Sequence, residues 1–191
     1  MNRHSKLCLA AIISAGLVAC GGSDSPDAAP VTSEPAAAAP AADAGAAGMP
    51  DWYHIDEEAM TVELHIAGQM DGGWKFNGMA NGEGTITVPV GYEITVEFTN
   101  DDSAMAHSLG VDAKVGGYGA MFDDPQPAFT GAITADPASM IEATLPGETE
   151  SFTFTADTAG EYAMVCYIPG HAVTGMWIRF NVSDGEPGVS M

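Results

Sequence analysis

The chain has 191 residues, enough for one domain or at most two small ones. Five Lys and Arg residues stand against 26 Asp and Glu residues, so the formal net charge is -21. Binding to nucleic acid relies on clustered Lys and Arg, so that class of protein is excluded. The same charge argues against peripheral docking on anionic lipid. Two interpretations of the acidity stay open. It serves either solubility in salty surroundings or the steering of a basic partner toward the protein.

Residues 1–19 have the pattern of a signal peptide. Arg3 and Lys6 precede an apolar run, 7–17, that is too short to cross a bilayer as a helix. The run ends in Leu-Val-Ala-Cys at 17–20, which resembles the lipobox of bacterial lipoproteins, whose cysteine is acylated after cleavage. An ordinary signal peptide cut at a small residue is the alternative. Lipidation of Cys20 would anchor the protein to a bacterial membrane outside the cytoplasm.

Residues 20–50 are predicted to form a disordered linker behind that anchor. Between residues 21 and 50 the chain has eleven Ala and five Pro but no aromatic residue. Proline recurs too often for the alanines to form a helix, so the segment is expected to be extended or flexible. Such a linker would let a small domain move away from its anchor and reach a partner.

From residue 51 onward, apolar and polar residues alternate in short runs, which predicts β-strands. Turn residues such as Asn81-Gly82 and Pro146-Gly147 separate the runs. Seven or eight strands of this kind, without a long helical pattern, predict an all-β sandwich over residues 51–191. Residues 115–140, rich in Gly, Pro and Asp, are expected to be a long loop inserted in it. The alternating runs are 62–66, 85–90, 93–99, 107–111, 151–155, 162–166 and 176–182.

One cysteine needs an explanation. Cys8 lies in the signal segment and Cys20 in the lipobox, which leaves Cys166 as the only other thiol of the chain. Exported proteins generally use cysteines in disulfide pairs. An unpaired Cys166 is therefore either buried and inert or held by a metal.

Cys166 opens a motif with the spacing C-x4-H-x4-M, which continues through His171 to Met176 on the loop between two predicted strands. A thiolate, an imidazole and a thioether are the ligand types that select copper. A blue copper site needs a second histidine, and His107 supplies it from the run 107–111. Each residue alone could be ordinary core, but the four together predict a metal site. No position is left open for a substrate, which favours an electron carrier over an enzyme.

The phrase Cys-Tyr-Ile-Pro-Gly-His-Ala-Val-Thr-Gly-Met at 166–176 resembles the ligand loop of the cupredoxin family, in its sulfocyanin and rusticyanin branch. Segments 76–82 and 88–91 are similar to sulfocyanins in particular, and the resemblance covers roughly residues 62–182. It implies a Greek-key β-sandwich of the cupredoxin type that holds one type 1 copper ion, cycling between Cu(II) and Cu(I). It also implies that Ser108 directs its backbone N–H at the Cys166 sulfur and ties the two ligand segments through its hydroxyl.

Three functions compete at this stage. The favoured one is a membrane-tethered carrier of single electrons between respiratory partners such as a cytochrome and a terminal oxidase, without a small-molecule substrate. A fragment of a copper oxidase or nitrite reductase would need further histidines, typically His-x-His pairs, which the chain lacks. A module for storing or delivering copper would need an exchangeable site with clustered Met or His.

The remaining histidines and the electron route give two expectations about the surface. His65 alternates onto the solvent side of its strand and His54 lies at the end of the linker, so neither is expected to bind copper. Electrons are expected to pass near His171, with its ring edge at the solvent. The apolar neighbours expected around that edge are Met105, Ala172 and Val173.

Overall fold

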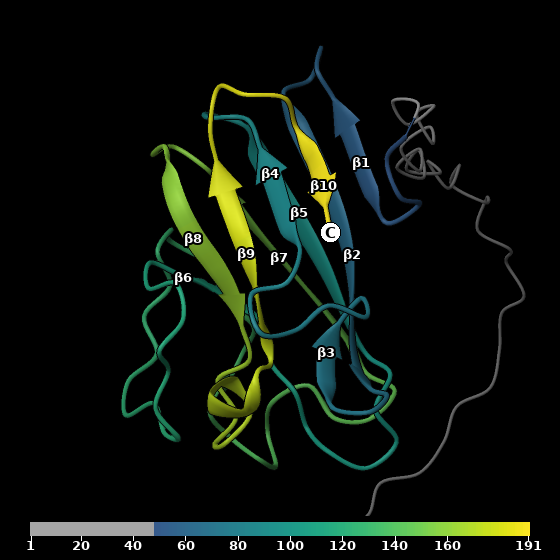
Figure 1. Ribbon diagram of the computed structural model, residues 1–191, viewed down its shortest axis with the longest axis vertical. Helices are drawn as coiled ribbons and strands as arrows, with labels where there is room; N and C mark the ends of the chain where they lie inside the picture. The colour runs from purple at the N-terminus through teal and green to yellow at the C-terminus, as the bar shows by residue number, and fades with distance from the viewer. Residues whose placement is uncertain (1–47) are drawn as a thin grey trace, which may run out of the picture. The chain divides into compact units, whose positions relative to one another are not determined.

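The structure is a computed structural model that describes residues 48–191. The predicted signal peptide, Cys20 and the linker up to residue 47 lie outside the described residues. The described part contains ten strands and one short 3-10 helix, η1 (Ala172–Thr174) (Figure 1). None of its helices is long and apolar enough to cross a membrane.

The first sheet has five strands, with β2 and β5 at its centre. These two strands are parallel and pair over eight residues, from Thr61 opposite Glu93 to Gly68 opposite Asn100. The other neighbours in this sheet are antiparallel. The strands are β1 (Tyr53–Asp56), β2 (Thr61–Met70), β5 (Glu93–Asn100) and β7 (Thr149–Thr155) in that order, with β3 (Trp74–Phe76) paired to β2.

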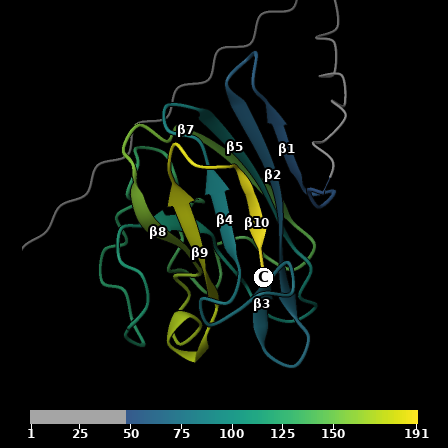
Figure 2. The same ribbon diagram turned by 45° about the horizontal axis from the view of Figure 1, so that its top comes forward.

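The second sheet also has five strands and faces the first, with β8, β9, β4 and β10 side by side in one layer (Figure 2). Its pair β4 and β9 is parallel, and the remaining pairs are antiparallel. Across the sandwich the rings of Phe154 and Phe180 lie 6.1 Å apart between centroids. The strands are β10 (Gly188–Ser190), β4 (Thr85–Val88), β9 (Trp177–Val182), β8 (Gly160–Val165) and β6 (Gly110–Asp112) in that order.

The period of two explains which side of each strand is buried. In β5 the residues Ile94, Val96 and Phe98 are completely buried, and the residues between them are partly exposed. The same alternation occurs in β2, β4 and β9, because successive side chains of a strand point to opposite faces of its sheet. The buried faces of both sheets form one core between the layers.

The all-β sandwich is confirmed, but the expected number of strands, seven or eight, is too low. The described residues form ten strands, because β1, β3 and β10 have only four, three and three residues, too few for an alternation to be recognised. The long loop is confirmed: no named strand lies between Asp112 and Thr149. Phe129 fastens this loop to the core by stacking on Phe154, with ring centroids 5.3 Å apart.

Candidate metal centre

Three buried donor groups meet close to β3 and η1. Figure 1 shows these two elements at the same end of the sandwich. His107 precedes β6, Cys166 directly follows β8, and His171 lies at the start of η1. Their two Nδ1 atoms are 3.1 Å apart, and the Cys166 Sγ lies 3.9 Å from the first and 3.5 Å from the second. Among residues 48–191 this is the only group of three or more His, Cys, Asp or Glu donors close enough to share one metal ion.

The 166–176 loop is held closed by its own backbone, which brings Met176 back beside the start of the loop. The N–H of Met176 donates to the carbonyl of His171 at 3.0 Å, and the N–H of Cys166 donates to the carbonyl of Met176 at 3.1 Å. Gly175 between them has a φ of 115°, a region that favours glycine. Met176 is completely buried. All four residues of the predicted set are thus drawn together at one buried point.

Ser108 connects the segment before β6 to the 166–176 loop. Its hydroxyl oxygen accepts a hydrogen bond from the N–H of Tyr167 at 2.9 Å, directly beside Cys166. The same oxygen lies 3.8 Å from the Cys166 sulfur. Ser108 directly follows His107 in the chain. These contacts therefore fix the position of the Cys166 sulfur relative to His107.

The sequence analysis missed one buried residue, Asp102. Its side chain is 1% exposed, and its Oδ2 lies 3.0 Å from Nε2 of His107, on the side of the ring away from Cys166. In the sequence it belongs to Asn100-Asp101-Asp102, a group of residues that is typical of a turn. The only sign of Asp102 in the sequence is a carboxylate five residues before a candidate histidine ligand. Neither a helix nor a strand brings residues at that spacing together, so the spacing does not predict the contact.

Burial sets the protonation of the donors before any metal arrives. It raises the pKa of Cys166 to about 11, although backbone hydrogen bonds of Ser108 and Ile168 oppose the shift. Burial and the neighbouring His107 lower the pKa of His171 to about 4. Burial also lowers the pKa of His107, against the opposing effect of Asp102. Near neutral pH both imidazoles are therefore uncharged, and Cys166 must lose a proton to bind a metal as thiolate.

Comparison with known proteins decides the family. The sulfocyanin (SoxE) domain matches residues 52–187, nearly all of the described chain. The chain belongs to the sulfocyanin family. This family places it among the cupredoxins, the blue copper proteins, which hold one type 1 copper ion as cofactor.

Individual relatives of this sulfocyanin-family chain match parts of it. Rusticyanin from Acidithiobacillus ferrooxidans is 36% identical over 94 residues, which are 49% of this chain and 46% of rusticyanin. Sulfocyanin from Sulfolobus acidocaldarius is 27% identical over 113 residues, 54% of this chain and 53% of that protein. The chain thus spans about half the length of the curated relatives it matches.

Solved structures of cupredoxins also align with the chain. A structure of rusticyanin from Thiobacillus ferrooxidans is 27% identical and covers 69% of this chain and 86% of its own, with a TM-score of 0.43. Reduced auracyanin from Roseiflexus castenholzii is 27% identical and covers 63% of this chain and 95% of its own, with a TM-score of 0.44.

The donors present in this sulfocyanin-family domain fit type 1 copper. A soft sulfur and two uncharged imidazoles face one another within reach of a single ion, and a thioether-bearing residue ends the same loop. The three donor residues are also nearly inaccessible to water. A buried site of soft ligands stabilises Cu(I) and excludes additional water ligands, as an electron-transfer centre requires.

The expected exposure of the His171 ring edge is wrong. His171 is only 1% exposed, because the indole of Trp74 on β3 stacks on its ring with centroids 3.8 Å apart and planes 19° apart. Ala172, an expected surface neighbour, is buried as well, whereas Val173 is exposed. Trp74 therefore stands between the site and the solvent on this side. The sequence could not assign it this place, because β3 is too short to show a pattern.

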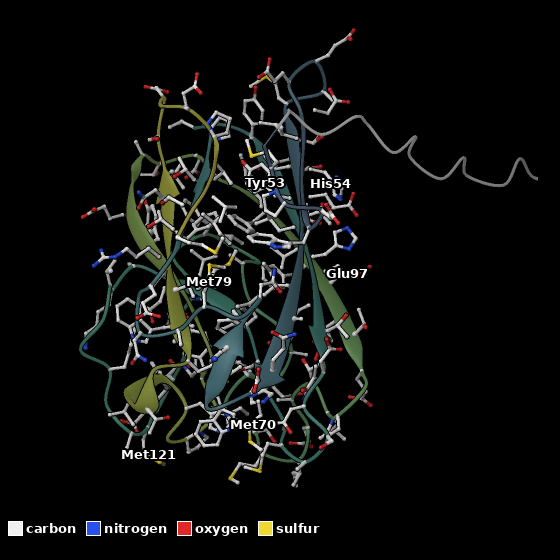
Figure 3. All side chains as sticks on the ribbon, turned by 45° about the vertical axis from the view of Figure 1, so that its right-hand side comes forward. Tyr53, His54, Met70, Met79, Glu97 and Met121 are labelled. Carbon is white, nitrogen blue, oxygen red and sulfur yellow. The ribbon has the colours of Figure 1, made fainter. Side chains whose placement is uncertain are left out.

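His54 and His65 lie outside the metal centre. His65 is on the outer face of β2, with Nε2 3.1 Å from Glu63 and Nδ1 3.4 Å from Glu97, and its side chain is 41% exposed. His54 is half-buried and lies in β1 rather than at the end of a linker, because β1 pairs with β2. Figure 3 shows His54 and Glu97 on the same side of the sandwich.

Proposed function

We propose that this protein is a membrane-tethered type 1 copper protein that carries single electrons between respiratory redox partners. In this proposal His107, Cys166, His171 and Met176 would hold one copper ion. The observation that carries it is the buried group of three donors, whose ligand atoms lie within 3.9 Å of one another.

A rigid site suits electron transfer because little has to move when one electron arrives or leaves. Copper, when bound, supplies the one-electron couple between Cu(II) and Cu(I). The chain contributes rigidity: the hydrogen bonds of Met176 and Cys166 close the loop, and Ser108 ties it to the segment of His107. Burial keeps water and substrates from the donors, which supports a carrier rather than an enzyme.

We propose that electrons pass through Trp74 rather than directly from His171. The indole ring lies in contact with the imidazole and also lines a groove of about 410 Å³ at the surface, together with Met70 and Thr174. Met70 is 58% exposed, and Figure 3 shows it at the same end of the sandwich as Met121. A redox partner that docks over this apolar groove would approach the copper site through a single indole ring.

The N-terminal sequence supports the proposed tether and location. Residues 1–19 would direct export and be removed, acylated Cys20 would anchor the chain to a bacterial membrane, and residues 21–50 would give the domain reach. Replacing Cys20 with Ser should release the full-length protein from the membrane fraction. A Cys20→Ser protein that stays with membranes would contradict the lipid anchor and leave the copper proposal untouched.

The test of the carrier function is reversible bleaching of the copper-loaded full chain. Loading with Cu(II) should give strong red-region absorption from charge transfer out of the Cys166 thiolate, and Cys166→Ser should lack it. The colour should disappear with reductant and return on reoxidation, with all copper retained in the presence of a competing Cu(I) chelator. Loss of copper at each reduction would instead support a module for copper storage or delivery.

A further inference from the structure

A buried carboxylate faces the ring of His107 from the side opposite to the metal site. β5 ends at Asn100, whose Oδ1 accepts the N–H of Asp102 at 3.0 Å, so the turn that follows is fixed. The amide of Asn100 also donates to the carbonyls of Met105 at 2.9 Å and of Thr144 at 2.8 Å. In this rigid turn the Oδ1 of Asp102 accepts the N–H of Ala104 at 2.8 Å, which leaves Oδ2 directed at His107.

We propose that Asp102 is a positioning residue that fixes the tautomer of His107 and lowers the reduction potential of the copper site. A carboxylate can only accept, so Nε2 of His107 carries the hydrogen and Nδ1 keeps its lone pair. Nδ1 is the atom that faces Cys166 and His171. The inference rests on the proposed copper function, because the potential in question belongs to that centre.

The pair of His107 and Asp102 differs from the other histidine–carboxylate pairs of the described residues in its burial. The side chains of His107 and Asp102 are 0% and 1% exposed, whereas His65 and its two glutamates are all at least 41% exposed. Salt and water screen an exposed charge effectively but a buried charge only weakly. The charge of Asp102 is therefore screened less than the charges of the two glutamates beside His65.

The two histidines of the site have different neighbours. His107 is held by a carboxylate, whereas His171 is stacked on the neutral indole of Trp74. A negative charge one imidazole ring away from the metal favours Cu(II) over Cu(I), because Cu(II) carries the larger positive charge. Burial and soft ligands favour Cu(I) and so raise the reduction potential. The charge of Asp102 opposes them and lowers it.

The experiment compares Asp102→Asn with Asp101→Asn in the copper-loaded full chain. Both variants remove one negative charge from adjacent positions, but Asp101 is exposed. Asp102→Asn should shift the Cu(II)/Cu(I) equilibrium toward Cu(I) by about tenfold or more, which raises the midpoint by about 59 mV per factor of ten. Asp101→Asn should shift it less than twofold, and added salt should leave the difference between the variants unchanged. Equal shifts in both variants, or no rise in Asp102→Asn, would overturn the proposal.

A second measurement needs no variant and remains decisive if Asp102→Asn fails to fold. The ¹⁵N shifts of His107 in the metal-free wild-type protein should show hydrogen on Nε2 and none on Nδ1. Hydrogen on Nδ1 would contradict the tautomer lock. A wild-type protein that binds no copper would instead contradict the proposed function, and the NMR result would still decide the role of Asp102 in the apo protein.

Discussion

Met176 ends the 166–176 loop, where its backbone bonds to both Cys166 and His171 and its side chain is completely buried. A thioether in this place has two possible roles. It would either donate weakly to a bound copper ion or only fill the core next to β9. The two roles differ in their effect on the reduction potential, because a thioether donor stabilises Cu(II) and Cu(I) to different degrees.

Replacing Met176 with Leu should raise the potential, because it removes a donor that Cu(II) needs more than Cu(I). Replacing it with Gln should lower the potential, because a harder carbonyl oxygen favours Cu(II). Each shift should be one or two tenfold steps in the equilibrium, with about 59 mV per step. Redox titration of both variants measures this. Shifts in the same direction, or none, would indicate that Met176 is only a packing residue.

His171 makes the stability of the metal-free protein depend on pH. Its pKa is lowered from 6.5 to about 4 in the folded state by burial and by His107. Between these values the unfolded chain binds more protons than the folded one, so the free energy of unfolding should fall as the pH drops from about 6.5 to about 4. The slope from this residue is at most about 1.4 kcal/mol per pH unit.

Denaturant unfolding of the apo protein and of His171→Gln at several pH values measures this contribution. Carboxylates titrate in the same range in both proteins, so the difference between the two slopes reports His171 together with its interaction with His107. Parallel curves would mean that His171 is protonated in the folded protein as easily as in the unfolded chain.

The 166–176 loop depends on a close approach between two elements. Gly175 has a φ of 115°, and a Cβ placed on it would lie 2.3 Å from Oδ1 of Asn81. Asn81 in turn donates its backbone N–H to the carbonyl of Gly175 at 2.7 Å. The segment between β3 and β4 therefore supports the loop from outside, at the residue that precedes Met176.

Gly175→Ala should destabilise the protein by about 3 kcal/mol, from backbone strain together with the clash, and should weaken or broaden the blue absorption. Gly147→Ala is the matched control, because Gly147 has a φ of 80° and a Cβ added to it would meet no atom within 4 Å. The control should cost about 1 kcal/mol and leave the spectrum unchanged. Denaturant unfolding and absorption spectra compare the two. Equal losses of unfolding free energy in the two variants would show that the Asn81 side chain moves aside without a measurable cost.

The elements differ in how well the sequence predicts them. β2, β5 and β9 have six to ten residues with one buried face, so their alternation is visible in the sequence. The segment Cys166 to Met176 was recognised because its donors are close in the chain and their spacing is a local property. β3 has three residues, and its pairing with β2 depends on contacts that no local pattern records.

The residues that the sequence left unassigned act across longer distances in the fold. Trp74 contacts His171 only because β3 folds back on β2. Asp102 meets His107 because Asn100 fixes the turn through bonds to three different residues. Both contacts depend on the tertiary arrangement, whereas residue types and spacing in the sequence describe only neighbours along the chain.

On the scale of the whole molecule, β2 joins two surfaces with different expected roles. Met70 ends the strand at the groove beside Trp74, and Met60 precedes the first residue of the strand at the other end. The two methionines are 58% and 49% exposed, and the nine residues between them in the extended strand separate their positions by about 30 Å. They form a matched pair for locating the surface through which electrons pass.

Met70→Glu should slow electron self-exchange between copies of the copper-loaded protein several-fold, because docking over the groove would have to desolvate a charge. Met60→Glu adds the same charge at the far end and should leave the rate within twofold. NMR line broadening in mixtures of the reduced and oxidised protein measures the rate, at high salt so that the net charge of -21 is screened. Equal effects of the two substitutions would place the exchange surface elsewhere.

The stacking of Trp74 on His171 also provides an optical signal of the metal centre. An excited indole in contact with a copper ligand loses its energy to the metal before it can emit light. Fluorescence should therefore fall when copper binds, and Trp74→Phe should remove most of that fall while Trp52→Phe keeps it. A fall that persists in Trp74→Phe would mean that another tryptophan senses the metal. If the signal belongs to Trp74, the emission of the unlabelled protein can follow copper uptake in real time.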